Sequence, residues 1–232
     1  MEQGTPEYEI RNRQVKFRAG EASYALNILE EINQGKLDNT WIQNMSEGEI
    51  DTFRGDVKDS MNLDMAVIGG HSFGGATTTL CLATDPRFKA GVALDAWMFP
   101  LREEKLNYTS PGNLLFLNCE KFQGTKNLET MKTYEGSLDN EVESNVLTVL
   151  NATHYAPTDI PIIMEGSSAG SLYRMIGGGG DTTGGLTNWD NLLLFSELFH
   201  SWIQKCLGLE NTFVKQVANQ KEHLRYGIDK QQ

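Results

Sequence analysis

The chain has 232 residues and a net charge of −11, and its 39% hydrophobic and 22% charged residues are ordinary for a globular protein. We expect a single domain over residues 1–232, because a chain of this length can bury one core. Nucleic acid is disfavoured as a partner, since an acidic surface repels a phosphate backbone. The sequence shows no long apolar run that would span a membrane and no signal-peptide pattern at its start, so we leave the compartment open.

The three cysteines, Cys81, Cys119 and Cys206, are too few and too widely spaced for a disulfide framework or a zinc site. The sequence also has no calcium loop and no histidine pair at metal-ligand spacing. We therefore expect neither a metal nor a cofactor.

The N-terminal part of the chain predicts one long helix followed by a surface excursion. Apolar residues recur at helical spacing from Glu7 to Gly35, and the glycine stands where a helix would end. The next stretch, 36–64, is polar and contains Gly, Asn and Asp, which predicts a loop with short helices.

Four short apolar runs follow, separated by helical or loop sequence, at 65–68, 90–94, 113–117 and 146–150. They do not alternate with polar residues, which is typical of strands covered by helices on both faces. The sequence therefore predicts an α/β fold, with the strands and the catalytic residues within 65–155.

The C-terminal part of the chain predicts a loop, a helix and a tail. Residues 160–189 are rich in glycine and indicate a loop or an insertion. An amphipathic helix is expected at 190–207, and a polar tail at 208–232.

A serine motif follows the first apolar run. Gly70-His71-Ser72-Phe73-Gly74 has the pattern G-x-S-x-G between a predicted strand and a predicted helix, which is the setting of a nucleophile elbow. Side chains two residues before and after the serine would collide in so sharp a turn, so we expect Gly70 and Gly74 to be required. Ser72 is then the candidate nucleophile, and the amide of Phe73 points to where an oxyanion would form.

A serine nucleophile needs a histidine base and a carboxylate that fixes the imidazole. His71 is expected to point away from the serine, His200 to pack within the last helix, and His223 to lie in the polar tail. His154 stands alone after the last apolar run, where a hydrolase base is expected. A loop histidine with no catalytic role is the alternative for His154.

Two carboxylates compete for the role of the acid. Asp95 follows the run at 90–94, and Glu120 follows the run at 113–117. Periodicity alone does not choose between them. Asp95 is embedded in apolar sequence, where a lone carboxylate is costly unless it binds a partner, and this favours Asp95. Its alternative role is that of an aspartate that caps a helix or stabilises a turn.

The sequence around the serine resembles one known family. The strings that carry the resemblance are Gly-His-Ser-Phe-Gly-Gly-Ala-Thr at 70–77, Asp-Pro-Arg-Phe at 85–88 and Ala-Leu-Asp-Ala-Trp-Met-Phe-Pro-Leu at 93–101. They closely resemble the platelet-activating factor acetylhydrolase family of plasma and intracellular type II enzymes. Tyr-Glu-Ile-Arg-Asn-Arg-Gln-Val at 8–15 is similar to the family's helix before the nucleophile strand, and the similarity extends through His154.

The resemblance implies an α/β-hydrolase fold and a calcium-independent serine esterase of the phospholipase A2 type. Such an enzyme removes the acetyl or short, often oxidised, acyl group from the sn-2 position of platelet-activating factor and related glycerophospholipids. Carried over by position, Ser72 is the nucleophile, Asp95 the acid and His154 the base, with the Phe73 amide in the oxyanion hole. The implied partners are a phospholipid substrate and a membrane or lipoprotein surface, for which the apolar segments 160–164 and 172–176 are candidates.

Two departures from the family pattern bear on activity. Gly69 adds a glycine before the elbow, which would alter the strand register or soften the turn. The family's first strands, and the loop with the second oxyanion amide, precede the helix at 8–15. We therefore expect a C-terminal portion of a larger hydrolase with an incomplete sheet. The alternative function is that of a catalytically weak or inactive hydrolase-fold fragment that binds lipid or another protein.

Overall fold

The structure, a computed structural model, describes residues 5–36, 44–106, 113–134, 145–165, 186–209 and 212–227. Its centre is a five-stranded sheet in which the strands lie side by side in chain order. The strands are β1 Val67–His71, β2 Ala90–Leu94, β3 Leu114–Cys119, β4 Val146–Val149 and β5 Leu224–Tyr226. The first four pair in parallel, and β5 pairs antiparallel with β4.

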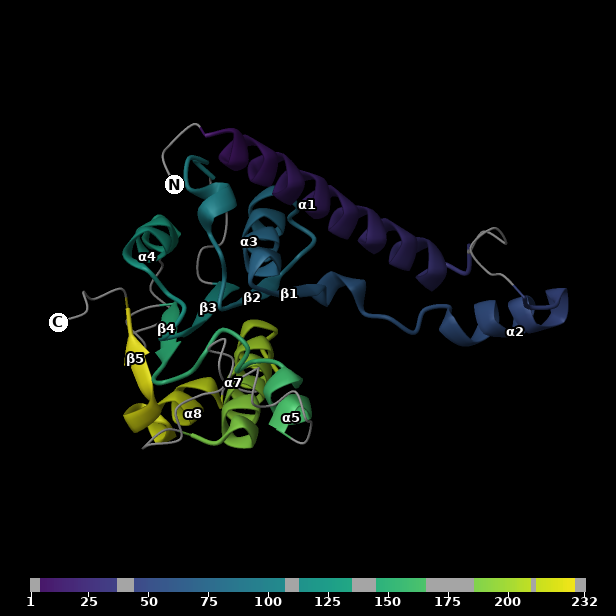
Figure 1. Cartoon of the computed structure of the whole chain (residues 1–232). Coiled ribbons are helices and arrows are strands. Elements are labelled where there is room, and N and C mark those ends of the chain that lie inside the picture. The colour runs from purple at the N-terminus through teal and green to yellow at the C-terminus, as the bar shows by residue number, and fades with distance from the viewer. Residues whose placement is uncertain are drawn as a thin grey trace.

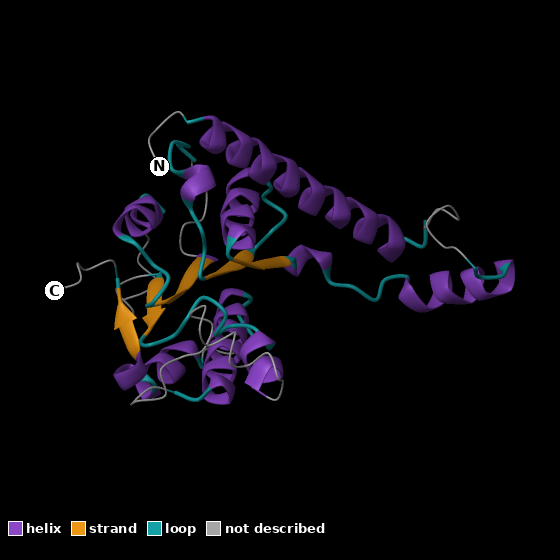
Figure 2. Ribbon diagram, in the orientation of Figure 1, coloured by secondary structure: helices purple, strands orange, loops and turns teal. Residues whose placement is uncertain are grey.

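Helices cover both faces of the sheet (Figure 1). One face carries α1 Pro6–Asn33, α3 Phe73–Thr84 and α4 Thr125–Lys132, and the other carries α5 Ile160–Glu165, α7 Asn188–Cys206 and α8 Phe213–Asn219. Helix α2 Glu47–Val57 lies beyond the end of β1, away from the other strands. Figure 2 shows the strands as a middle layer between the two helical layers. Short 3₁₀ turns occur at Leu63–Met65, Phe99–Leu101 and Lys221–His223.

Side-chain alternation along the strands builds one apolar core on each face. Val92 and Leu115 pack with Trp202 of α7, whereas the next residues, Ala93 and Phe116, belong to the core under α1 and α3. Successive residues of a strand point to opposite faces, so a strand covered on both faces is apolar at every position. This is why the strands appear in the sequence as unbroken apolar runs.

Most of the predicted elements are confirmed, with shifted boundaries. The long N-terminal helix is α1, the helix expected at 190–207 is α7, and the four apolar runs are β1 to β4. The polar stretch 36–64 contains α2, as a loop with short helices would. β1 begins two residues later than its apolar run, because Leu63–Met65 form a 3₁₀ turn, and it continues to His71.

The prediction of a polar tail over 208–232 is wrong for the residues described there. α8 and β5 form in this segment because three apolar side chains anchor them on the core: Phe213 is fully buried, and Val217 and Leu224 are 2% and 5% exposed. The predicted Gly-rich loop begins with α5, and its residues 166–185, including the segment 172–176, lie outside the described residues. None of the described helices is both long enough and apolar enough to cross a membrane.

β1 lies at one edge of the described sheet, where it pairs with β2 alone among the described strands. Val67 is 38% exposed there. The outer face of α1 is also apolar, since Ile10, Phe17 and Tyr24 recur every seventh residue and are 55%, 70% and 55% exposed. The edge and the helix face together leave apolar surface uncovered within the described structure.

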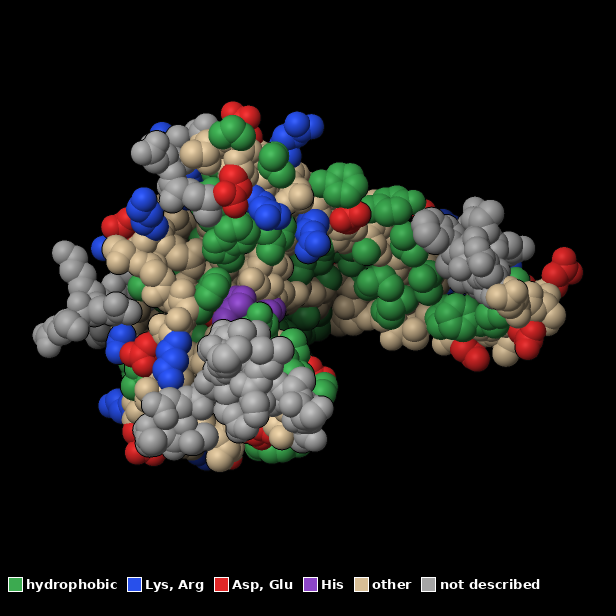
Figure 3. All heavy atoms as spheres, in the orientation of Figure 1, with side chains coloured by type: hydrophobic (Ala, Val, Ile, Leu, Met, Phe, Trp, Pro, Cys, Tyr) green, Lys and Arg blue, Asp and Glu red, His purple; other side chains and the backbone are tan. Residues whose placement is uncertain are grey.

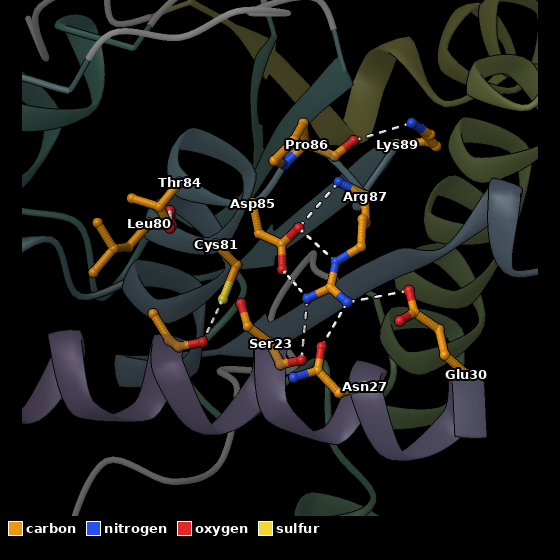
Figure 4. Close-up of polar contacts among 11 residues, drawn as sticks. Ser23, Asn27, Glu30, Leu80, Cys81, Thr84, Asp85, Pro86, Arg87 and Lys89 are labelled. Atoms are coloured by element: carbon orange, nitrogen blue, oxygen red, sulfur yellow. Dashed lines mark hydrogen bonds and ion pairs between the residues drawn. The ribbon is translucent and has the colours of Figure 1, made fainter. Parts of the chain in front are cut away.

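Arg87 ties the turn between α3 and β2 to helix α1 (Figure 4). Its guanidinium donates to both carboxylate oxygens of Asp85, at 2.9 and 2.6 Å. It also donates to the carbonyl of Ser23 and to the side chains of Asn27 and Glu30 on α1, at 3.2, 2.6 and 3.1 Å. The hydrogen bonds from Arg87 lower the pKa of Asp85 to about 2. The motif Asp-Pro-Arg-Phe thus fixes the helix that borders the serine.

We expect Arg87→Lys to lower the free energy of unfolding by about 1–3 kcal/mol, because a lysine cannot reproduce the two-pronged contact with Asp85. Urea denaturation of the variant and of the unsubstituted protein at pH 7 measures this. The pKa of Asp85 is depressed in the folded state, so its stabilisation is present above its ordinary pKa of about 4 and is lost as the pH falls towards 2. The difference should therefore shrink over that range. Lys89→Gln, at an exposed neighbouring site, is the matched control, and an equal loss there would contradict the account.

Candidate active site

Ser72 lies on a strained turn between β1 and α3. Its backbone φ is 60° and ψ is −118°, which a residue other than glycine rarely adopts. Three backbone hydrogen bonds hold the turn: the Ser72 amide donates to Leu94 at 2.9 Å, and the amides of Gly75 and Trp97 donate to the Ser72 carbonyl at 3.0 and 2.9 Å. The turn places the serine hydroxyl at the carboxyl end of the strands and at the N-terminus of α3.

Of the two glycines expected to be required around the serine, one is required and the other is not. A Cβ on Gly70 would overlap the backbone of Gly74, so the turn requires glycine at position 70. A Cβ on Gly74 would meet no described atom within 4 Å, so the collision expected there is absent. The second tight position is Gly75, whose Cβ would lie 2.5 Å from that of Ala96. Gly69 does not disturb the register, because it pairs regularly with Val92 in the ladder.

His154 lies in the turn after β4, beside the serine. Its Nε2 is 3.0 Å from the Oγ of Ser72, and its Nδ1 is 2.6 Å from Oδ2 of Asp95. A carboxylate only accepts hydrogen bonds, so Nδ1 carries the proton and Nε2 is left to accept from the serine. The ring of Phe122 stacks on the imidazole at 3.7 Å between centroids and holds its plane.

Asp95 follows β2 and is fully buried. Its Oδ1 accepts from the Cys119 amide at 2.8 Å and from the side-chain amide of Gln123 at 2.5 Å, which leaves Oδ2 for His154. These donors supply the partners that a buried carboxylate requires. Asp95 also adopts a positive φ of 42°, so the chain turns sharply at the end of β2 to direct the carboxylate at the imidazole.

Glu120 lies at the end of the next strand and makes different contacts. It accepts from the Asn151 amide at 2.8 Å and from Arg225 of β5 at 2.7 Å. The structure therefore brings Asp95, and not Glu120, to His154. Two other histidines lie elsewhere: His200 is exposed on α7, where we expected a packing residue, and His223 pairs with Glu222 at 3.4 Å.

His71 contributes a contact that the sequence did not suggest. Its Nε2 lies 2.7 Å from the backbone carbonyl of His154, and the two rings are 4.5 Å apart between centroids. Burial lowers the pKa of His71, which favours the neutral ring, and the carbonyl fixes the proton on Nε2. His71 thus positions the backbone of His154 from β1.

A second set of unpredicted residues supports the acid. Gln123 donates to Asp95, and its side-chain oxygen accepts from Asn127, which also donates to the carbonyl of Ala96 at 2.7 Å. The oxygen of the Asn127 side chain accepts from the Met98 amide at 2.6 Å. The loop after β2 is therefore held by two side-chain amides from the segment that begins α4. Isolated Gln and Asn residues carry no pattern that would have revealed this.

The cysteines offer no reactive thiol in the structure. Burial raises the pKa of Cys81 and of Cys206 to about 12, and it raises the pKa of Cys119 as well. The candidate metal ligands that lie together in the described residues are His71, Asp95 and His154, whose ligand atoms all fall within 4.8 Å of one another. Those atoms already bond to one another or to Ser72 and the His154 carbonyl, so a cation would have to displace these hydrogen bonds.

A cleft of about 860 Å³ opens in front of the serine, between α1 and the elbow. Ser72, Phe73 and Trp97 form its inner wall. The outer wall is one face of α1, with Ile10, Arg11, Arg13, Gln14, Phe17, Arg18 and Glu21. Phe73 is the first residue of α3, so its amide has no partner within the helix and is free to donate to a group bound at Ser72.

Residues 1–223 match the model of the family described as platelet-activating factor acetylhydrolase, isoform II. The chain belongs to this family. The platelet-activating factor acetylhydrolases of dog and cattle are each 32% identical to it over 213 residues, which cover 92% of this chain and 44% of theirs. The chicken enzyme is 32% identical over 174 residues, or 75% of this chain and 39% of its own. The chain thus spans less than half the length of these acetylhydrolases.

A solved structure supports the assignment of the fold. The ferulic acid esterase from Streptomyces cinnamoneus superposes with a TM-score of 0.60 over 93% of this chain and 55% of its own, at 14% identity. At that identity the likeness concerns the fold alone. The predicted α/β-hydrolase fold is confirmed. The family named from the sequence is confirmed by the family model and by the acetylhydrolase relatives.

Proposed function

We propose that this chain carries the catalytic residues of a calcium-independent serine esterase that removes the acetyl or another short acyl group from the sn-2 position of glycerophospholipids. The observation that carries the proposal is the unbroken chain of hydrogen bonds from Ser72 Oγ through His154 to the buried Asp95. Membership of the acetylhydrolase family supports the choice of substrate.

In the acylation step, Ser72 attacks the ester carbonyl while its proton moves to Nε2 of His154. Asp95 stabilises the imidazolium through Nδ1, and its other oxygen stays bound to Cys119 and Gln123. The oxyanion accepts a hydrogen bond from the Phe73 amide, to which the N-terminus of α3 adds its dipole.

Collapse of the tetrahedral intermediate breaks the bond to the glycerol oxygen, which leaves as an alcohol with the proton from His154. Water then takes the place of the alcohol, gives a proton to His154 and attacks the acyl-serine. The products are the lysophospholipid and a short carboxylic acid, and Ser72 regains its proton.

Acyl-chain selectivity tests the proposal. We expect release of acetate from the sn-2 position of an ether phosphocholine to be much faster than release of palmitate from the matched long-chain lipid. Ser72→Ala supplies the background rate for both substrates. A protein whose turnover of the acetyl substrate does not exceed that of Ser72→Ala would contradict the proposal.

We expect hydrolysis to survive metal chelation. The imidazole of His154 activates the nucleophile and the Phe73 amide stabilises the oxyanion, so no step requires a cation. The rate should change less than about twofold after dialysis against EDTA. Removing a single catalytic hydrogen-bond donor, by comparison, lowers a rate by about 10²-fold or more. Loss of activity with EDTA and its recovery with calcium would replace the serine mechanism with a metal-assisted one.

A second candidate function is that of a catalytically weak hydrolase-fold protein that binds lipid or another protein. The exposed apolar residues of α1 and the edge at β1 favour it. Contact with a membrane or lipoprotein surface is part of this proposal, and α5 offers Ile160 and Ile163, which are 39% and 60% exposed. Binding of Ser72→Ala to phosphatidylcholine vesicles, without turnover by the unsubstituted protein, would favour this second function.

A further inference from the structure

A basic strip of α1 borders the cleft in front of Ser72. The cleft is lined by the arginines Arg11, Arg13 and Arg18 and by one carboxylate, Glu21. This local excess of positive charge is opposite in sign to the net charge of the whole chain, which is −11. Figure 3 shows blue basic side chains along this helix, next to a green apolar patch and close to the purple of a histidine.

Arg11 and Arg18 lie on the same face of α1, because seven residues correspond to two helical turns. The guanidinium of Arg18 is 5.3 Å from the ring centre of Phe73, the residue after the nucleophile. The guanidinium of Arg11 is 5.7 Å from the ring of Trp97, whose amide donates to the Ser72 carbonyl. Both cations are therefore held against the aromatic side chains that flank Ser72.

Neither guanidinium pairs with a carboxylate in the described part of the chain. Arg11 donates to the side-chain oxygen of Gln14 at 3.0 Å, and Arg18 lies over the ring of Phe73. Lys16, on a different face of the same helix, pairs with Glu104 at 2.6 Å. A guanidinium that stacks on an aromatic ring keeps its in-plane N–H groups for an anion, and its fork matches the oxygens of a phosphate.

We propose that Arg11 and Arg18 form a phosphate-binding subsite, which holds the phosphodiester of the substrate while Ser72 attacks the neighbouring ester. This inference rests on the proposed function and deepens it, because it makes the enzyme prefer phosphate-bearing esters to neutral ones. Free phosphate presents the same oxygens, so it would bind the same pair of arginines and compete with the substrate.

The first test compares two soluble acetyl esters that differ in the phosphate. One is a short-chain acetyl ether phosphocholine, and the other is the acetyl glycerol ether without phosphocholine. The ratio of their kcat/KM values should fall about tenfold in Arg11→Gln and in Arg18→Gln, the scale of one charge-assisted hydrogen bond. In Arg18→Lys this ratio should fall less, because lysine keeps the positive charge and loses only the forked geometry of the guanidinium. Lys132→Gln removes the same charge from an exposed site on α4 and should leave the ratio unchanged.

Inorganic phosphate separates the two sources of the anion. It should inhibit the unsubstituted protein competitively, and its inhibition constant should rise about tenfold in Arg18→Gln. If phospholipid turnover depends on the arginines but inorganic phosphate does not inhibit it, the subsite binds the phosphate of the lipid headgroup and not free phosphate. A substrate ratio that is the same in both glutamine variants and in the unsubstituted protein would overturn the proposal.

A binding measurement keeps the subsite testable apart from catalysis. Calorimetry on Ser72→Ala measures the dissociation constant of the short-chain phosphocholine without turnover. Adding Arg18→Gln should raise this constant about tenfold. If no ester is hydrolysed but the dissociation constant rises in this way, the proposed function fails and the subsite stands. Binding that is insensitive to both arginines, or absent in Ser72→Ala, would overturn the subsite.

Discussion

Replacing Ser72 with alanine should lower kcat for ester hydrolysis by about 10⁵-fold, because the three residues of a serine triad act as a unit. His154→Ala should lose about as much, since Oγ then has no acceptor at 3.0 Å for its proton. Steady-state turnover of an acetyl phospholipid, with thermal denaturation to verify folding, measures both effects.

The double variant Ser72→Ala/His154→Ala is the sharper comparison. If the two residues act in one step, it should be no slower than either single variant. His200→Ala, at an exposed position on α7, is the control and should turn over normally. Losses that multiply in the double variant, or a His154→Ala protein near the normal rate, would remove His154 from the mechanism.

Asp95→Asn should be the next most damaging change, at about 10⁴-fold in kcat. The amides of Cys119 and Gln123 donate to Oδ1, so the asparagine must place its oxygen there and turn its NH₂ group towards His154. Nδ1 would then have to accept a hydrogen bond, and the proton would move to Nε2. In that tautomer the imidazole cannot take the proton from Ser72.

Glu120→Gln is the matched comparison, because it removes one carboxylate from the neighbouring strand end. Turnover should stay within about threefold of normal, since Glu120 bonds to Arg225 and not to the imidazole. The free energy of unfolding should fall by less than about 1 kcal/mol, as for a partly exposed ion pair at the surface. If Glu120→Gln lost most of its turnover and Asp95→Asn lost little, Glu120 and not Asp95 would be the acid of the triad.

Much of the fold could be predicted because the strands are covered on both faces. Runs such as 90–94 and 114–117 carry no polar side chain, and two helical layers are the arrangement that buries them. β5 escaped prediction because it has three residues, and it is held by its pairing with β4 and by the buried side chain of Leu224. Pairing depends on tertiary structure, which a local pattern does not contain.

In the site, too, local sequence predicts some features and tertiary structure determines the others. The spacing around Ser72 predicted the turn, because a sharp strand-to-helix connection has few solutions. The apolar surroundings of Asp95 already favoured it over Glu120 in the sequence. The features that separate the two carboxylates in space are the positive φ of Asp95 and the position of Arg225, and neither is a property of local sequence. The tight contact at Gly75 depends on Ala96, which lies 21 positions away in the printed sequence.

Covalent labelling tests most directly whether Ser72 is an activated nucleophile. A fluorophosphonate should add one adduct per chain, found by mass spectrometry on the peptide that carries Ser72, because an activated serine reacts much faster than an ordinary one. An acetyl phospholipid should slow the labelling, and His154→Ala should abolish it. An unlabelled Ser72, or labelling that proceeds at the same rate in His154→Ala, would contradict the account.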